Sequence, residues 1–127
     1  MNMDHGMLLQ IGGIYHLAFV VFHLFFWKLF RWKADLRSLT PINQAVMPIL
    51  NLCLTFVFLG FAYLSLFYTE ELLAEGLGRA VLGVICVFWV LRAIQQVVFF
   101  GLRKPRSAFL FVVFLGGVAL YLVPLTG

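Results

Sequence analysis

The sequence predicts an all-α integral membrane protein, an antiparallel four-helix transmembrane bundle. The first observation is composition: 64% of the 127 residues are hydrophobic and 11% are charged, whereas soluble domains are about half apolar and about a quarter charged. The second observation is the presence of four long apolar runs. The third is that the connections between these runs alternate between basic and acidic.

Each apolar run is long enough to cross a bilayer as a helix, since a crossing needs roughly 20 apolar residues. In lipid, only helices and closed barrels satisfy their own backbone, and these runs lack the alternating polarity of barrel strands. We therefore expect a single transmembrane domain, 1–127, with helices at about 7–30, 42–68, 80–102 and 108–125.

The connections predict the orientation. Seven of the nine Lys and Arg residues lie at the first and third connections, and the second connection carries three glutamates. Basic residues stay on the cytoplasmic side of a membrane, which favours a plasma or inner membrane with both termini outside. By the same logic, Trp27 and Trp32 are expected at the inner interface, and Tyr68 and Tyr121 at the outer one.

Polar side chains interrupt three of the runs in the half of the membrane that faces the cytoplasm. From the rise of a helix, His23 lies about 10 Å, Asn51 about 13 Å and Arg92 about 15 Å from the inner helix ends. Gln95 and Gln96 share the side of Arg92 through i+3 and i+4 spacing. The expected ligand-binding layer therefore consists of Arg92, Gln95, Gln96, Asn51 and His23.

Arg92 is the centre of this layer. An arginine in the middle of a transmembrane helix costs about 2.5–3.5 kcal/mol on insertion scales, and no Asp or Glu lies in the apolar runs to offset that cost. The guanidinium keeps its proton and needs an outside partner. This favours a protein that binds or transports an anionic or polar small molecule, or a lipid headgroup, held bidentately.

Two other functions are consistent with the sequence. His16 and His23 are seven residues apart on one helix face and could ligate haem or another metal. The cofactor is therefore unknown, with haem as one candidate, and neither Cys nor Glu lies nearby to complete a non-haem site. Alternatively, the chain is a small accessory subunit in which Arg92 pairs with a carboxylate of a larger complex. Ordinary interhelical hydrogen bonding also accounts for such residues.

Other functions are less favoured. We find no carboxylate pair, nucleophile or nucleotide motif that would indicate an enzyme. The net charge of +4 does not indicate nucleic acid, because the basic residues lie at helix ends. The expected partners are the lipid bilayer, the ligand and a second copy in a homodimer. Close helix approaches are expected at Gly12-Gly13, Gly60, Gly83 and Gly116-Gly117.

Overall fold

A computed structural model describes residues 2–127, with side chains from His5 onward. Within this range the chain is helical and contains no strand. Four helices are long and apolar enough to cross a membrane, which indicates a membrane location. The elements are α1 (Asn2–Leu24), α2 (Phe26–Leu29), α3 (Trp32–Asp35), the 3-10 helix η1 (Leu36–Ser38), α4 (Pro41–Phe67), α5 (Thr69–Leu73), α6 (Leu77–Gln95), the π-helix η2 (Gln96–Phe100) and α7 (Pro105–Thr126).

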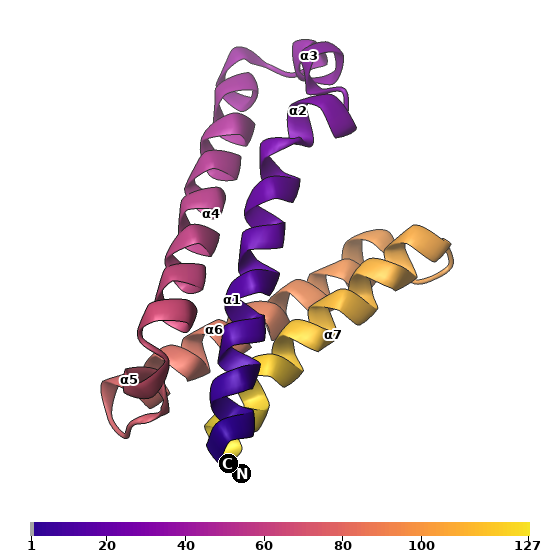
Figure 1. Ribbon diagram of the computed structural model, residues 1–127. Helices are drawn as coiled ribbons and strands as arrows, with labels where there is room; N and C mark the ends of the chain where they lie inside the picture. The colour runs from indigo at the N-terminus through magenta and orange to yellow at the C-terminus, as the bar shows by residue number, and fades with distance from the viewer. Residues whose placement is uncertain (1) are drawn as a thin grey trace.

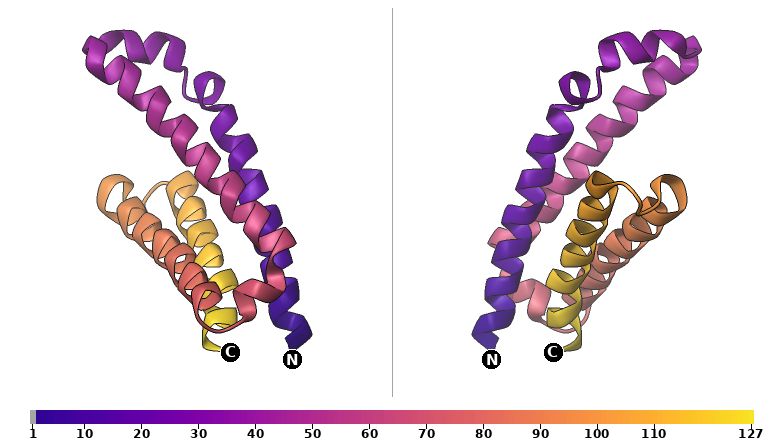
Figure 2. Two further views of the ribbon diagram at one scale, coloured as in Figure 1. Left: turned by 90° about the vertical axis from the view of Figure 1, so that its left-hand side faces the viewer. Right: turned by 90° about the vertical axis from the view of Figure 1, so that its right-hand side faces the viewer.

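The four long helices form two hairpins, α1 with α4 and α6 with α7 (Figure 1). Helix α1 also packs along α7 and so joins the two hairpins. The hairpins meet near the termini and diverge toward their other ends (Figure 2). We call these diverging ends the basic ends, because they carry the connections at 30–40 and 101–104, which hold most of the Lys and Arg residues.

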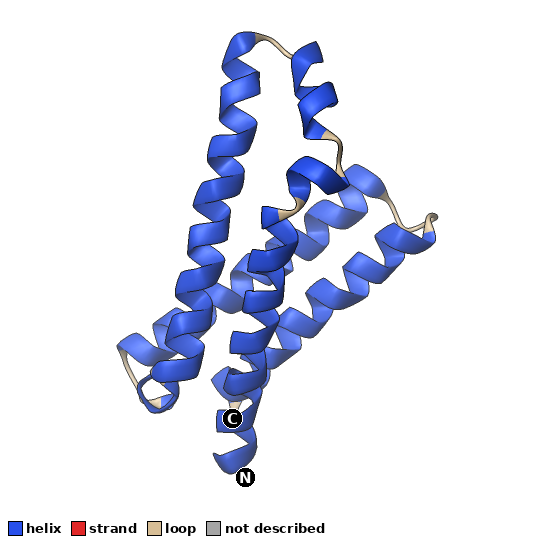
Figure 3. Cartoon of the chain, turned by 45° about the horizontal axis from the view of Figure 1, so that its top comes forward, coloured by secondary structure: helices blue, strands red, loops and turns tan. Residues whose placement is uncertain are grey.

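The first helix is shorter at its basic end than the apolar run from 7 to 30 suggests. Helix α1 ends at Leu24, because Phe25 leaves helical geometry with φ −92° and ψ 4°. Helix α2 resumes at Phe26, and Arg31 then turns the chain with a left-handed φ of 55°. Figure 3 shows these interruptions as short loop segments.

Prolines begin two of the other helices. Thr40 is extended and Pro41 takes the first turn of α4, where a missing N–H leaves no helical bond unmade. Pro105 begins α7 in the same way. Helix α6 begins at Leu77, three residues before the expected 80, and its π-helical continuation ends where Gly101 adopts φ 73°.

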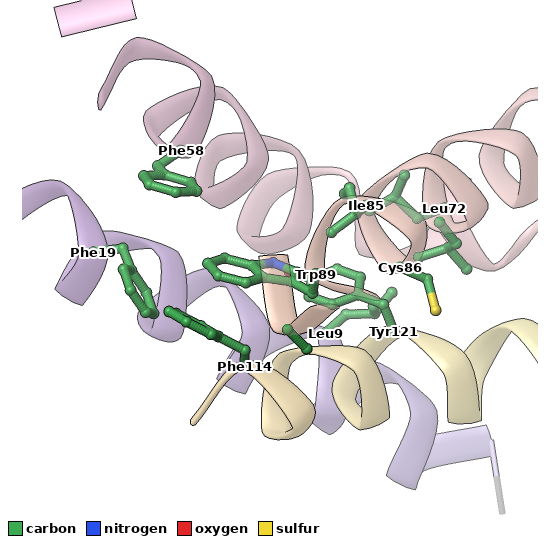
Figure 4. Close-up of a cluster of buried hydrophobic side chains, with 11 residues drawn as sticks. Leu9, Phe19, Phe58, Leu72, Ile85, Cys86, Trp89, Phe114 and Tyr121 are labelled. Carbon is green, nitrogen blue, oxygen red and sulfur yellow. The ribbon is translucent and has the colours of Figure 1, made fainter. Parts of the chain in front are cut away.

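The core lies where the two hairpins meet, around the fully buried Trp89. Its ring stacks between Phe58 of α4, at 5.5 Å, and Phe114 of α7, at 5.7 Å between centroids (Figure 4). Phe19 of α1 approaches the same ring to 4.9 Å. One indole of α6 therefore contacts aromatic side chains of all three other long helices.

Three glycines allow the helices to approach closely at this core. A Cβ atom on Gly12 would lie 2.5 Å from the Tyr121 hydroxyl, and one on Gly117 would lie 2.6 Å from the Tyr15 hydroxyl. A Cβ on Gly13 would overlap the Leu66 side chain. Among the described residues, a Cβ atom on Gly60, Gly83 or Gly116 would meet nothing within 4 Å, so these three glycines mark no close approach between helices of this chain.

Candidate functional site

The interior polar residues fall into two sets, and the first lies where the hairpins meet. Each long helix contributes one fully buried residue: His16 from α1, Ser65 from α4, Trp89 from α6 and Tyr121 from α7. We call these four residues the His16 network. The prediction that Tyr121 marks the outer interface is wrong, since its side chain is 0% exposed.

Hydrogen bonds join the whole His16 network. Trp89 Nε1 donates to His16 Nε2 at 3.0 Å, and the Tyr121 hydroxyl lies 3.1 Å from His16 Nδ1 and 2.6 Å from Ser65 Oγ. His16 Nδ1 also lies 2.8 Å from the carbonyl oxygen of Gly12. An indole N–H only donates and a carbonyl only accepts. His16 is therefore the neutral tautomer that carries its proton on Nδ1.

This arrangement bears on the haem hypothesis. The only lone pair of the neutral ring, on Nε2, already accepts the Trp89 N–H. His16 is fully buried, so an iron atom would have to displace that indole. His16 does not fit the role of a haem ligand here. Over the described residues, no three His, Cys, Asp or Glu side chains lie close enough together to hold a metal ion.

The second set lies further toward the basic ends and includes His23, two turns beyond His16 on α1, and Asn51 of α4. Asn51 Nδ2 donates to the backbone carbonyl of His23 at 3.0 Å, which joins α4 to α1. Both side chains are more than nine-tenths buried. Asn51 Oδ1 has no hydrogen-bond partner among the described residues. His23 Nδ1 lies 2.8 Å from the carbonyl of Phe19, so this nitrogen donates.

Arg92 belongs to the same level on α6. Its guanidinium carbon lies 4.5 Å from the centroid of the Phe114 ring, a cation–π contact. Within residues 5–127 the Arg92 side chain forms no hydrogen bond or ion pair. Arg92 is only partly buried. The charge therefore lies beside an aromatic face, and none of its five N–H donors is bonded within the described part of the chain.

Gln95 and Gln96 differ from each other in environment. Gln96 is 2% exposed, and its Nε2 donates to Ser107 Oγ at 2.8 Å across the hairpin of α6 and α7. The Oε1 atom of Gln96 is buried without a partner in the described chain. Gln95 is exposed. Gln96 thus ties η2 to the start of α7, whereas Gln95 faces outward.

The structure relates the two sets through the aromatic core. Arg92 follows Trp89 by three residues, and His23 follows Phe19 by four, so each lies one turn closer to the basic end than a core ring. Those two rings are 4.9 Å apart. Arg92 of α6 and His23 of α1 therefore both lie one turn beyond the rings at which the two hairpins touch.

A pocket of about 400 Å³ lies at the opposite end of the molecule. Its lining includes His5, Glu70 and Arg79. Arg79 donates to the carbonyl oxygen of Leu125 in the last turn of α7. This guanidinium therefore stabilises a helix end, whereas that of Arg92 forms no hydrogen bond with the residues from His5 onward.

Sequence reasoning missed Ser65, Trp89 and Tyr121 as polar partners. A buried indole or phenol needs a hydrogen-bond partner, which is a signal that could have paired them with His16. In the second set, Arg92 carries donors, and Asn51 Oδ1 and His23 Nε2 are acceptors without a partner among residues 5–127. Comparison of the chain with family models, curated proteins and solved structures finds no match in any of the three.

Proposed function

We propose that this protein binds an anionic or polar small molecule or a lipid headgroup within the membrane, at the level of Arg92, Asn51 and His23. The observation that supports the proposal is that the charge of Arg92 has no neutralising partner in the described part of the chain. Arg92 lies inside a membrane-length helix, and no hydrogen bond or ion pair neutralises it among residues 5–127. Gln95 and Gln96 lie on the following turn as further polar groups.

The energies favour a missing anionic partner. Burying an arginine in a helix of this kind costs about 2.5–3.5 kcal/mol. The cation–π contact with Phe114 returns about 0.5–2 kcal/mol, which leaves part of the cost uncompensated. A carboxylate or phosphate that accepts two guanidinium N–H groups would supply the remainder, since charge-assisted bonds contribute about 1.5–3 kcal/mol.

The inferred orientation gives such a ligand a route. We infer that the four helices cross antiparallel, with the basic ends in the cytoplasm and both termini outside, because basic connections stay on that side. The hairpins separate toward the basic ends (Figure 2). A headgroup in the inner leaflet would then lie at the depth of Arg92, whose side chain is only partly buried.

Another membrane protein could meet the same need with an Asp or Glu. Apolar side chains next to this level favour contact with lipid or protein, since Val98, Phe99 and Phe100 are 69%, 76% and 66% exposed. An accessory subunit would then co-purify with its complex, and a homodimer would appear as a second copy. Native mass spectrometry distinguishes these outcomes from a bound small molecule or lipid.

The test compares two arginines. Wild type, Arg92→Gln and Arg79→Gln are purified in mild detergent, and bound molecules are identified by native mass spectrometry. We expect wild type and Arg79→Gln to retain the same anionic or zwitterionic species. Arg92→Gln should retain tenfold to a hundredfold less, as expected for the loss of about 1.5–3 kcal/mol. Equal retention by all three proteins would exclude Arg92 as the binding residue.

A further inference from the structure

The acceptor atoms of the second set impose a further requirement on the ligand. Asn51 uses its Nδ2 on the His23 carbonyl, and this orientation is fixed because two carbonyl oxygens do not bond. Asn51 Oδ1 is then left as an acceptor, in a side chain 7% exposed, with no partner in the described part of the chain. An unsatisfied buried acceptor costs about 1–3 kcal/mol.

His23 presents a second acceptor. Its Nδ1 faces the Phe19 carbonyl at 2.8 Å, so the proton of the neutral ring is on Nδ1. Nε2 then carries a lone pair, and it forms no hydrogen bond within residues 5–127. Asn51 and His23 therefore each carry an acceptor without a partner among residues 5–127, whereas Arg92 carries only donors.

An anion without an N–H or O–H group does not meet both requirements. A carboxylate or a phosphodiester alone would accept from Arg92 but would bring no donor to Asn51 Oδ1. We propose that the ligand is a phospholipid whose headgroup joins its phosphate to an N–H or O–H donor, with phosphoethanolamine as the representative. This inference rests on the proposed function and specifies its ligand.

Charge and position favour a lipid as the source of this headgroup. Arg92 and His23 lie one turn beyond the touching rings of Trp89 and Phe19. Exposed apolar side chains follow Arg92 on η2, at Val98, Phe99 and Phe100, so acyl chains would remain in contact with apolar surface. Seven of the nine Lys and Arg residues lie at the basic ends, which complements the phosphates of the inner leaflet.

The experiment uses a series of headgroups on identical acyl chains. Wild-type protein is incubated with equal amounts of dioleoyl phosphatidylethanolamine, its N,N-dimethyl derivative and phosphatidylcholine, and retention is measured by native mass spectrometry. The first two lipids keep an N–H donor and phosphatidylcholine has none. We expect about tenfold weaker retention of phosphatidylcholine, the effect of one lost hydrogen bond to a buried acceptor.

Variants separate this inference from the proposed function. Asn51→Leu should lose the preference for phosphatidylethanolamine, whereas Asn43→Leu, at an exposed position of the same helix, should keep it. The preference is the ratio of phosphatidylethanolamine to phosphatidylcholine retained by the folded protein. A variant that folds in lower yield would therefore leave this ratio unchanged. Arg92→Gln should lower the retention of every lipid in the series.

Three outcomes would overturn the proposal. Equal retention of phosphatidylethanolamine and phosphatidylcholine, with Arg92→Gln still impaired, would refute the donor requirement and leave the proposed function intact. Retention of lipid that does not depend on Arg92 would refute both. Displacement of the lipid by free phosphoethanolamine at equal concentration would show that the source is a soluble ligand rather than the membrane.

Discussion

The indole nitrogen of Trp89 donates a hydrogen bond of 3.0 Å to Nε2 of His16, across α6 and α1. This bond determines which tautomer the histidine adopts, because the indole N–H cannot accept. The same imidazole is 3.1 Å from Tyr121, whose hydroxyl is 2.6 Å from Ser65. One ring thus links the four long helices at the point where the hairpins meet.

Removing the indole donor should destabilise the protein. Trp89→Phe keeps an aromatic ring but leaves the buried Nε2 of His16 without a partner, at a cost of about 1–3 kcal/mol. The measurement is the free energy of unfolding in detergent, followed by helical circular dichroism. Trp27→Phe is the control, since Trp27 is 48% exposed and should change stability little. Equal effects of the two substitutions would contradict a stabilising role for the His16 network.

Two adjacent glycines on α7 should respond in opposite directions. Gly117→Ala would place a Cβ 2.6 Å from the Tyr15 hydroxyl and 3.0 Å from the Trp89 ring, so it should cost about 1–3 kcal/mol through overpacking. The Cβ of Gly116→Ala would meet no described atom within 4 Å, so this substitution should be neutral or stabilising, because alanine favours a helix by about 1 kcal/mol relative to glycine. Thermal unfolding of the pair in one detergent tests the helix packing, and a Gly117→Ala variant as stable as Gly116→Ala would show that α7 does not approach α1 this closely.

The four membrane-length helices could be predicted from the sequence because length and apolar composition are local properties of each run. The break at Phe25 could not, since no proline or glycine marks it and the apolar run continues through it. The separation of the hairpins could not be predicted from the sequence either. It depends on the contact of Gly12 with Tyr121 and of Gly117 with Tyr15, between residues about a hundred positions apart.

The candidate site, like the fold, could be predicted from the sequence only in part. Helix depth grouped His23 with Asn51, and the structure joins them by a hydrogen bond. Depth alone could not show that Gln95 faces outward or that Gln96 binds Ser107. Tyr121 was assigned to the interface because tyrosines gather there. In the structure, Tyr121 is hydrogen-bonded to Ser65, which is 56 residues away in the sequence. A general rule about membrane interfaces contains no information about that contact.

The orientation can be tested at the connections. In a Cys53→Ser, Cys86→Ala background, single cysteines at the exposed positions Lys33 and Glu75 are treated with a membrane-impermeant maleimide on intact cells. If basic residues stay in the cytoplasm, Glu75→Cys should react directly. Lys33→Cys should react only after the cells are permeabilised. The reverse pattern would place the basic ends outside and move Arg92 to the outer leaflet.

Haem binding gives a test of the two histidines. Because His16 Nε2 already accepts the Trp89 N–H, haemin added to purified wild-type protein should gain no axial ligand from His16. Visible absorption of wild type and His16→Gln should therefore be the same after titration with haemin. His23→Gln serves as the comparison, since His23 Nε2 forms no hydrogen bond among residues 5–127. A low-spin Soret band in wild type that disappears in His16→Gln but persists in His23→Gln would contradict this expectation. It would mean that iron binds His16 Nε2 in place of the Trp89 N–H, and that the hydrogen bonds of the His16 network break in the purified protein.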